Sequence, residues 1–492
     1  MTGPNLIPSL SRRAALAGLM TLPAAPSLAA VGLRDDRVPP DATREDARLL
    51  RRVYERLHPG LLRYNTATGL GEAFDRLEAG PAGGETLEAW YLRLSLFLAT
   101  LKCGHSYANF YNQSAAVRAR LYERDDRLPF QFLWLGDRMI VTADPTGEGV
   151  APGSEIVTLN GQPAGAVLAR LIQAARADGS NDGKRRQLMS VQGQDGYESF
   201  DVFYALMFGS RTAHDLDVDG PDGRRRTLRV PAISLAARRA QGAVATQAGD
   251  APQWTMDHRG RTAVLTMANW GLYDSAWDWR RWLDQEMDAL ATRATDRLVV
   301  DIRANEGGLD CGDHLAARLT DRTLAPDMGR RLVRYRRIPD DLRPVLDTWD
   351  RSFDDWGEAA QPFDERFLTL RRSTGDGATI APKGPRFTGQ VVVLTGPQNS
   401  SATYGFARMV KRERLGTLIG EPTGGNRRGI NGGAFYFLRL PATGLEVDLP
   451  LIGYFPTTPE PDAGLEPDVL VPTTAEAIAR GEDPAMQAAL TA

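Results

Sequence analysis

The chain has 492 residues, 42% of them hydrophobic and 25% charged, which is the composition of a globular protein and not of a fibrous or disordered one. Its 59 basic and 62 acidic residues nearly balance and form no long basic block, so the composition argues against a dedicated nucleic-acid binder. The length predicts two or three domains. With two cysteines and no HExxH or CxxC motif, no metal site is expected.

Residues 1–30 have the layout of an export signal. Arg12 and Arg13 precede a mildly apolar, Ala-rich stretch from Ala14 to Ala30, which is typical of a twin-arginine signal. We therefore expect a soluble protein that is exported in its folded state to the periplasm or the cell exterior. The alternative is a frayed N-terminal helix with an accidental arginine pair. Stable membrane insertion is not expected, because a membrane span needs about 20 strongly apolar residues.

Two patterns divide the next part of the chain. Residues 31–122 carry helical periodicity and predict an N-terminal helical domain. Residues 123–250 carry short strand patterns, including a hairpin signal at Asn160-Gly161 that is followed by a predicted helix over 164–175. The run from 152 through this helix resembles the centre of a PDZ-like domain, a module that binds extended peptides by strand addition. The polar remainder is interpreted as the rest of that domain and a linker.

Residues 251–478 alternate between strands and helices. Apolar, β-branched runs cover 262–267, 298–302 and 390–395, and helical stretches separate them, which predicts a partly parallel sheet in a mixed α/β chain. Catalytic groups gather at the carboxyl ends of such strands, so the loops that follow the second and third runs are candidate sites. Residues 479–492 are predicted to be a C-terminal tail.

Both loops fall in runs of sequence that have counterparts in a known family. One run is Leu298-Val-Val-Asp-Ile-Arg-Ala-Asn-Glu-Gly-Gly. Another is Val391-Val-Val-Leu-Thr-Gly-Pro-Gln-Asn-Ser-Ser-Ala-Thr, followed by Leu418-Ile-Gly-Glu-Pro-Thr-Gly-Gly, and a third is Gly464-Leu-Glu-Pro-Asp-Val-Leu-Val-Pro. In order and spacing these runs resemble the S41 serine peptidases, the family of the C-terminal processing (tail-specific) proteases and the tricorn core protease. The resemblance covers residues 255–475 and implies an S41-like catalytic core.

Ser401 is the predicted nucleophile. It follows a buried strand and precedes a predicted helix over 402–410, whose free backbone N–H groups can meet a developing oxyanion. The resemblance favours Ser401 over Ser400, a weaker candidate, because Ser401 lies 25 residues before the position of the general-base Lys in tail-specific proteases. That position holds Asn426, and an amide cannot take a proton from a hydroxyl, so a Ser/Lys dyad is excluded there.

Histidine is the natural substitute for the missing base, because its pKa lies near working pH. His105 is the predicted base, since Cys103-Gly-His-Ser resembles the Gly-His-Ser/Thr element of tricorn-type members, in which the matching His activates the serine. His314 is the rival, because it lies shortly after the Gly307-Gly308 pair; its alternative role is that of a core histidine. The lysines match no family motif convincingly, and they are Lys102, Lys184, Lys383 and Lys411.

The remaining groups of the site are implied by the resemblance. A carboxylate shortly before Gly464 would hold the histidine, and Glu460 is preferred over Asp462, with a solvated loop carboxylate as the alternative. The oxyanion hole would consist of backbone N–H groups of Gly307 or Gly308 and of Ala402.

The sequence leaves open how Glu306 affects the oxyanion site and whether the two cysteines form a disulfide. Glu306 stands where relatives often carry Gly or a small residue, and it would oppose an oxyanion unless it points away or pairs with Arg303. Cys103 and Cys311 lie near the predicted catalytic elements, and in an exported protein they invite a disulfide. Two separate buried thiols are the alternative, because a disulfide needs a Cα separation that the sequence does not supply.

The leading hypothesis is an exported serine endopeptidase of the S41 type, which acts on peptides or unfolded proteins through an acyl-enzyme, with no metal or organic cofactor. One alternative is a non-catalytic S41-fold protein that binds peptides or hydrophobic ligands, which Asn426 and Glu306 favour. Another is an esterase that uses the same residues, because a fold alone does not separate these activities.

Overall fold

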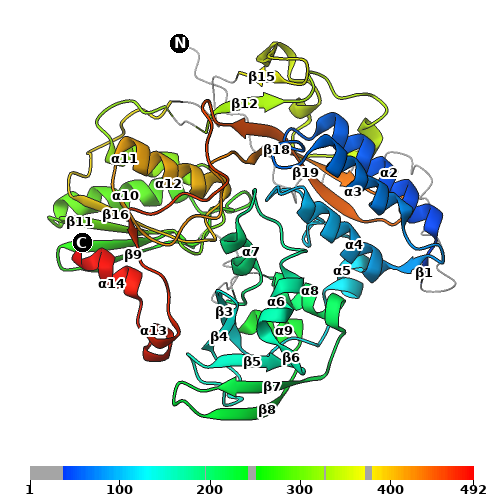
Figure 1. Cartoon of the computed structure of the whole chain (residues 1–492). Coiled ribbons are helices and arrows are strands. Elements are labelled where there is room, and N and C mark those ends of the chain that lie inside the picture. The colour runs from blue at the N-terminus through cyan, green and yellow to red at the C-terminus, as the bar shows by residue number, and fades with distance from the viewer. Residues whose placement is uncertain (1–36, 194–195, 242–250, 326–327, 372–378) are drawn as a thin grey trace.

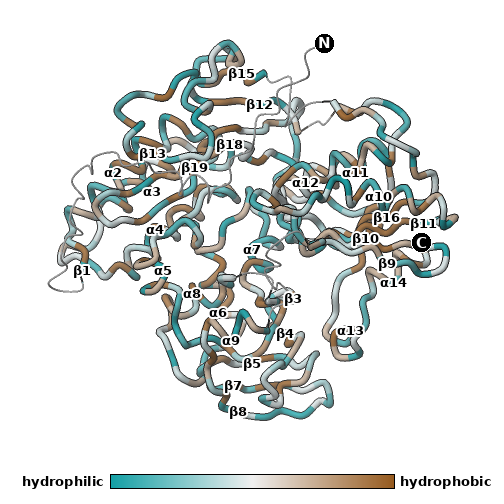
Figure 2. Tube along the Cα trace, turned by 180° about the vertical axis from the view of Figure 1, so that it is seen from behind, coloured by the Kyte–Doolittle hydropathy of each residue, from teal (hydrophilic) through white to brown (hydrophobic). Residues whose placement is uncertain are grey.

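The computed structural model describes residues 37–193, 196–241, 251–325, 328–371 and 379–492, and the predicted export signal at 1–30 lies outside them. Within these ranges, no helix is both long enough and apolar enough to span a membrane. The N-terminal helices lie on one side of the molecule and a parallel sheet with its helices on the other, while the β-rich segment 123–241 lies below both (Figure 1). The short helix α7 (Asp182–Leu188) lies between these parts in both views (Figures 1 and 2).

The N-terminal region is helical, as its periodicity predicts. α2 buries one face, on which Leu50, Val53 and Leu57 recur at helical spacing. α4 begins after Thr86, whose Oγ1 accepts a hydrogen bond from Ala89 N at 3.2 Å, and α4 leads directly into the segment that contains His105. The elements are β1 (Arg37–Val38), α2 (Pro40–Leu57), α3 (Ala67–Ala79), β2 (Glu85–Thr86), α4 (Leu87–Thr100) and α5 (Ala115–Leu121).

The β-rich segment forms one antiparallel sheet in the order β3-β4-β5-β7-β8. Asn160 and Gly161 both have positive φ (53° and 76°), which is the backbone that the predicted hairpin turn requires. The helix that follows ends at Leu171, earlier than predicted, and the PDZ-like identity of the segment stays a prediction. The elements are β3 (Gln131–Leu135), β4 (Arg138–Ala143), β5 (Glu155–Leu159), β6 (Gln162–Pro163), α6 (Ala164–Leu171), α7, α8 (Ser199–Phe208), β7 (Ala213–Asp219), β8 (Arg225–Pro231) and α9 (Leu235–Ala240).

The second sheet has the order β20-β17-β16-β11-β10-β9 and is parallel except for β9, so the predicted mixed α/β fold is confirmed. The apolar runs at the predicted positions form β10, β11 and β16, which lie next to one another (Figure 2). The elements are β9 (Thr255–Arg259), β10 (Thr262–Thr266), α10 (Trp279–Thr292), β11 (Arg297–Asp301), α11 (Cys311–Leu319), β16 (Gln390–Thr395), α12 (Ser401–Glu413), β17 (Thr417–Gly420), β20 (Val469–Leu470), α13 (Ala475–Arg480) and α14 (Pro484–Thr491).

Both faces of this sheet are covered, because alternate strand residues point to opposite faces. On one face, Val300 and Val393 share a core with α10, α11 and α12. On the other face, Val299 and Val392 pack with Ala489 of α14. The predicted C-terminal tail is therefore wrong as a description of 484–491, since these residues form a helix that closes one face of the sheet.

A further antiparallel sheet, of order β13-β18-β19-β12-β15-β14, was not anticipated. Its long strands contribute Tyr436 and Leu449 to a core that also contains Tyr54 of α2 and Phe203 of α8. The core therefore joins this sheet to the N-terminal helices and the β-rich segment. The elements are β12 (Arg330–Val333), β13 (Leu346–Asp347), β14 (Ala360–Pro362), β15 (Leu368–Leu370), β18 (Asn431–Arg439) and β19 (Glu446–Phe455), with short 3-10 helices at Arg343–Val345, Arg351–Asp354 and Gly357–Ala359.

Candidate active site

Ser401 lies at the turn between β16 and α12 and has a φ of 51°, in the left-handed region that non-glycine residues rarely adopt. A sharp strand-to-helix turn of this kind projects a side chain away from both elements. The hydroxyl of the neighbouring Ser400 donates to the carbonyl of Glu306 at 3.1 Å and is buried. Geometry therefore distinguishes the two serines and favours Ser401 as the reactive one.

The turn is held by side chains that the sequence analysis did not select. Asn399 is fully buried; its Nδ2 donates to the carbonyls of Ile302 and Asn305, and its Oδ1 accepts from Gly396 N at 2.8 Å. Thr403 Oγ1 also donates to the carbonyl of Asn305, at 3.1 Å. The loop after β16 is therefore bound to the loop after β11, which brings Ser401 beside the Gly307-Gly308 pair.

Gly307 approaches Ser401 so closely that no other residue fits. A Cβ on Gly307 would lie 2.9 Å from Ser401 Cβ and 2.9 Å from the carbonyl oxygen of Ser400, and its φ is 121°. The N–H of Gly307 donates to Asn305 Oδ1 at 2.9 Å. In the described part of the chain, the N–H groups of Gly308 and Ala402 make no hydrogen bond, so these two are the available donors for an oxyanion.

His105 follows a chain reversal at the end of α4, where Lys102 has a φ of 53°. Gly104 fixes the segment: its N–H donates to Asp178 Oδ1 at 3.0 Å and its carbonyl accepts from Arg176 Nη1 at 2.8 Å. The imidazole packs on the ring of Phe435, with centroids 5.5 Å apart, and its buried Nδ1 has no hydrogen-bond partner among the described residues.

Burial lowers the pKa of His105 to about 4, and the nearby cations Arg176 and Lys184 act in the same direction, while Glu306 opposes them. The imidazole is therefore neutral at neutral pH and has a nitrogen that can accept a proton. This is the protonation state that a general base requires.

The other histidines close to these elements have structural partners. Gly60 N donates to His58 Nδ1 at 3.0 Å, so Nε2 carries the proton and donates to Ser106 Oγ at 2.9 Å. His314, the rival base, binds Asp284 through Nε2 at 3.0 Å and packs against Trp279. The geometry therefore favours His105 over His314.

Glu306 is bound by two cations from the β-rich segment. Its carboxylate lies 2.8 Å from Arg176 Nη1 and 2.8 Å from Lys184 Nζ, and the Lys184 side chain is only 2% exposed. Burial alone would raise the pKa of Glu306, but Arg176 and Lys184 together hold it well below its usual range. The pairing with Arg303, which the sequence left open, is not formed, because Arg303 binds Asp301 and Asp483 instead.

This ion cluster connects the loops of the predicted catalytic residues. Arg176 binds both the carbonyl of Gly104, next to His105, and Glu306, next to Gly307. Lys184 Nζ also donates to the carbonyl of Gln398, in the loop that carries Ser401, at 3.0 Å. Sequence reasoning missed both cations, because they lie in a polar segment without periodicity; the rarity of lysine in this chain was the only signal.

Residues 178–181 extend the same connection. Ser180 N donates to Asp462 Oδ1 at 2.8 Å, and Asn181 Nδ2 donates to the carbonyl of Thr423 at 2.9 Å. Asn426, at the position of the tail-specific Lys, is fully buried and donates to the carbonyl of Asp178 at 3.1 Å and to Asp462 Oδ1 at 2.8 Å. Asn426 therefore joins loops instead of acting as a base.

Glu460 binds Arg427 at 2.6 Å and Arg408 at 3.7 Å, and it makes none of the described hydrogen bonds to His105. Its role as the group that orients His105 stays a prediction. Cys103 and Cys311 are both buried free thiols, so the disulfide alternative is not realised.

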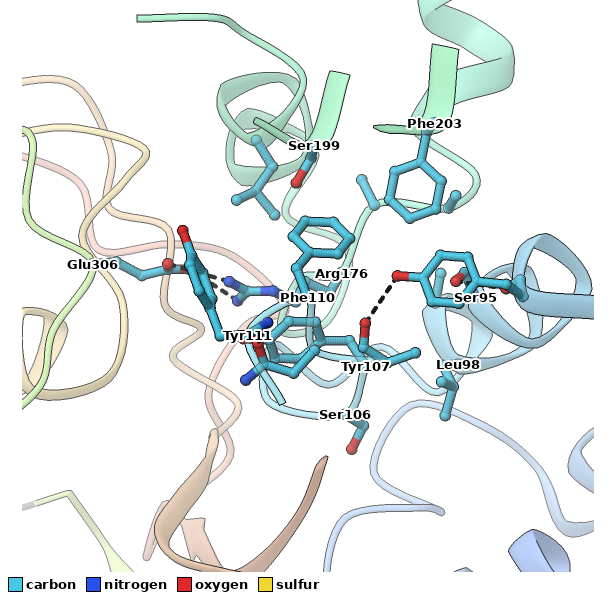
Figure 3. A pocket seen from close by; sticks show the side chains of 17 residues that line it. Ser95, Leu98, Ser106, Tyr107, Phe110, Tyr111, Arg176, Ser199, Phe203 and Glu306 are labelled. Atoms are coloured by element: carbon cyan, nitrogen blue, oxygen red, sulfur yellow. Dashed lines mark hydrogen bonds and ion pairs between the residues drawn. The ribbon is translucent and has the colours of Figure 1, made fainter. Parts of the chain in front are cut away.

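A cavity of about 90 Å³ adjoins the site (Figure 3). It lies between α4, the segment after His105 and α8, and Arg176 and Glu306 line one side of it. Ser106, the neighbour of His105, lines another part.

Part of the chain matches a known protein family, and its fold matches solved structures. Residues 261–469 match the family model of peptidase family S41. A structure of mature CPAF complexed with lactacystin aligns with a TM-score of 0.63 at 16% identity, covering 92% of this chain and 97% of that chain. Mature CPAF aligns with a TM-score of 0.58 at 15% identity, covering 89% and 94%. The photosystem II D1 C-terminal processing protease aligns at 16% identity, covering 90% and 98%, with a TM-score of 0.41.

The two CPAF alignments show a shared fold, and no curated protein matched the sequence. The matched segment contains both loops around Ser401 and the Gly307-Gly308 pair, which carried the resemblance seen in the sequence. Residues 261–469 therefore match a peptidase family S41 domain, and this match supports a serine-type peptidase.

Proposed function

We propose that the protein is an exported serine endopeptidase in which Ser401 is the nucleophile and His105 the general base. The observation that carries the proposal is the left-handed turn of Ser401 against Gly307, with the segments of Ser401, Gly307 and His105 tied together through Arg176, Lys184 and Glu306. Export is supported by the arginine pair and Ala-rich stretch at the N-terminus.

In the proposed reaction, Ser401 Oγ attacks the carbonyl carbon of the scissile peptide bond while its proton passes to the neutral imidazole of His105. The N–H groups of Gly308 and Ala402 receive the oxyanion. The C–N bond then breaks as His105 returns the proton to the leaving amine, which leaves an acyl-enzyme. Water deprotonated by His105 hydrolyses the ester and restores Ser401.

The paired state of Glu306 removes one objection to catalysis. An unpaired carboxylate beside the oxyanion site would repel the developing negative charge, but this one is neutralised by Arg176 and Lys184. The non-catalytic alternative loses that support. An esterase would use the same residues, and comparison of matched peptide and ester substrates separates the two activities.

The proposal is tested by intact-mass analysis of the exported protein after exposure to a small fluorophosphonate. The wild type is expected to gain one adduct and to lack residues 1–30. Ser401→Ala should gain none, and His105→Ala should react roughly a hundredfold more slowly or worse, which is the usual contribution of a general base. Lactacystin, which is complexed with CPAF in a solved structure, is a second probe.

Ser400→Ala is the matched control, because its hydroxyl lies next to Ser401 but is bound to Glu306. It should still be modified at Ser401. An adduct on Ser400, or none on folded wild-type protein, would refute the assignment of the nucleophile.

A further inference from the structure

The cavity beside the site is lined mainly by apolar and aromatic side chains. Leu98 of α4, Phe110 of the segment after His105 and Phe203 of α8 are all at most 6% exposed and line it, together with Ala174 and Ala175 after α6. Phe203 and Ser199 point into it from one side, and Leu98 and Ser95 lie on another (Figure 3). Tyr111, which is 50% exposed, lines its outer part.

The charges on its lining compensate each other. Arg176 and Glu306 form an ion pair at 2.8 Å, and the Arg176 guanidinium lies 4.2 Å from the centre of the Tyr107 ring. A charged side chain that entered would lose hydration and find no free partner of opposite sign on this pair. An apolar side chain would instead replace water on the aromatic surfaces.

The size and the place of the cavity fit a substrate side chain. A cavity volume of about 90 Å³ is several times the roughly 10–15 Å³ that one water needs, so the cavity has room for a group larger than a single water. Two of its lining residues are chain neighbours of the catalytic groups: Ser106 follows His105, and Glu306 precedes Gly307. These neighbours place the cavity next to the segments of His105 and Gly307, where the proposed function places the peptide substrate.

We infer that this cavity binds a large apolar side chain, aromatic or aliphatic, of the residue that flanks the scissile bond. The inference rests on the proposed function and adds the substrate class: segments with Phe, Leu or similar residues at the cleavage point. Segments with Gly, Asp or Lys at that position are poor substrates. Gly leaves the apolar lining exposed to water, and Asp or Lys would bury a charge beside it.

The test uses diphenyl phosphonates built on the Gly, Ala, Leu, Phe and Lys skeletons. Ser401 Oγ forms the new P–O bond and one phenol leaves, so intact mass gives the rate of modification for each side chain. For wild-type protein, the Leu and Phe reagents should react roughly ten to a hundred times faster than the Gly and Lys reagents, as expected for burial of such a side chain.

Two variants that fill the cavity, Ala99→Leu and Ser199→Leu, probe it from different helices. In either one, the ratio of the Phe rate to the Gly rate should fall at least fivefold. Ala169→Leu, an exposed position on α6 that does not line the cavity, is the matched control and should keep the wild-type ratio.

The outcomes separate the two proposals. Wild-type protein that reacts with the small fluorophosphonate but shows equal rates across the side-chain series overturns the cavity assignment and leaves the nucleophile intact. A steep series that both filling variants preserve also overturns it. Failure of every reagent, including the fluorophosphonate, refutes the proposed function itself. The wild-type series decides the question even if the filling variants do not fold.

Discussion

Two carboxylates near the predicted catalytic groups, Glu306 and Glu460, are each bound by two cationic side chains, but they connect different parts of the chain. Glu306 binds Arg176, 130 residues earlier, and Lys184, and so joins the Gly307 loop to the segments of His105 and Ser401. Glu460 binds Arg427, 33 residues earlier, and Arg408. Glu306, which was expected to hinder catalysis, thus joins the segments of Ser401, Gly307 and His105, while Glu460, which was expected to assist it, is bound by other residues.

Glu306 and Glu460 are the same type of residue, yet their partners give them different effects. A carboxylate beside an oxyanion site is unfavourable only when its charge is free, and the position of the cations decides whether it is. The partners of Glu306 come from a segment that is remote in sequence, so the neutralisation is a product of the fold.

The largest expected difference is between Glu306→Ala and Glu460→Ala. Removal of Glu306 leaves Lys184, with 2% exposure, buried without its counter-ion, so the free energy of unfolding should fall by about 2–4 kcal/mol. Fluorophosphonate labelling should slow at least tenfold, because the three loops lose their common partner. Removal of Glu460, whose partner Arg427 is 36% exposed, should cost about 1 kcal/mol and change labelling less than threefold.

Urea unfolding and labelling rates on both variants check this prediction. If Glu460→Ala slowed labelling as much as His105→Ala does, Glu460 would be the third group of the triad, as the resemblance implies. Glu460 would then affect catalysis directly, contrary to the expected difference between the two carboxylates.

A smaller effect is expected on the pH dependence. Because the pKa of His105 is lowered to about 4, the acid limb of the labelling rate should lie near pH 4 and not near 6.5. Arg176→Met removes a cation that lowers this pKa, so its limb should move to higher pH. Glu306→Gln removes an anion that raises it, so its limb should move to lower pH.

Labelling rates measured between pH 3.5 and 8 on folded protein test whether the two variants shift the acid limb in opposite directions. A loss of folding alone would lower both rates without moving the limbs apart. Limbs that shift in the same direction, or a wild-type limb near 6.5, would contradict the assignment of His105 as the titrating base.

The smallest expected effect concerns Asp178, which accepts a hydrogen bond from Gly104 N. Burial raises its pKa from 3.8 to about 6, so the native state binds more protons than the unfolded state between these values. Wild-type stability therefore decreases as pH rises through this window. Asp178→Asn keeps an acceptor for Gly104 without the charge, and its stability relative to wild type should be about 1 kcal/mol greater at pH 8 than at pH 5.

Asp462→Asn is the matched control. Burial alone would raise the pKa of Asp462, but the hydrogen bonds from Ser180 and Asn426 lower it. It should lower the unfolding free energy at pH 8. Urea unfolding at both pH values measures the two variants, and an Asp178→Asn variant that is less stable than wild type at pH 8 would contradict the burial argument.

The sequence by itself determined the parallel strands and the family resemblance of the loops that follow β11 and β16. An apolar, β-branched run is favourable to bury whichever strands lie beside it in the sheet. The strands β10, β11 and β16 were therefore predictable. Ser401, Gly307 and His105 could be proposed from the sequence because each lies in a short contiguous motif next to an element end, and their roles stay predictions. Helix α14 and the sheet of β18 and β19 were missed, since neither had a distinctive local period.

Only the tertiary structure decided which charges meet. Arg176, Asp178 and Lys184 lie in a polar stretch whose spacing predicts nothing, yet they bind the segments of His105, Gly307 and Ser401. The periodicity of apolar residues along a short segment is enough to predict which side of that segment is buried. A buried ion pair instead depends on two distant segments that lie within a few ångströms of each other only in the folded protein. The sequence could therefore propose Ser401 and His105, but it could not predict the network of charges that connects their segments.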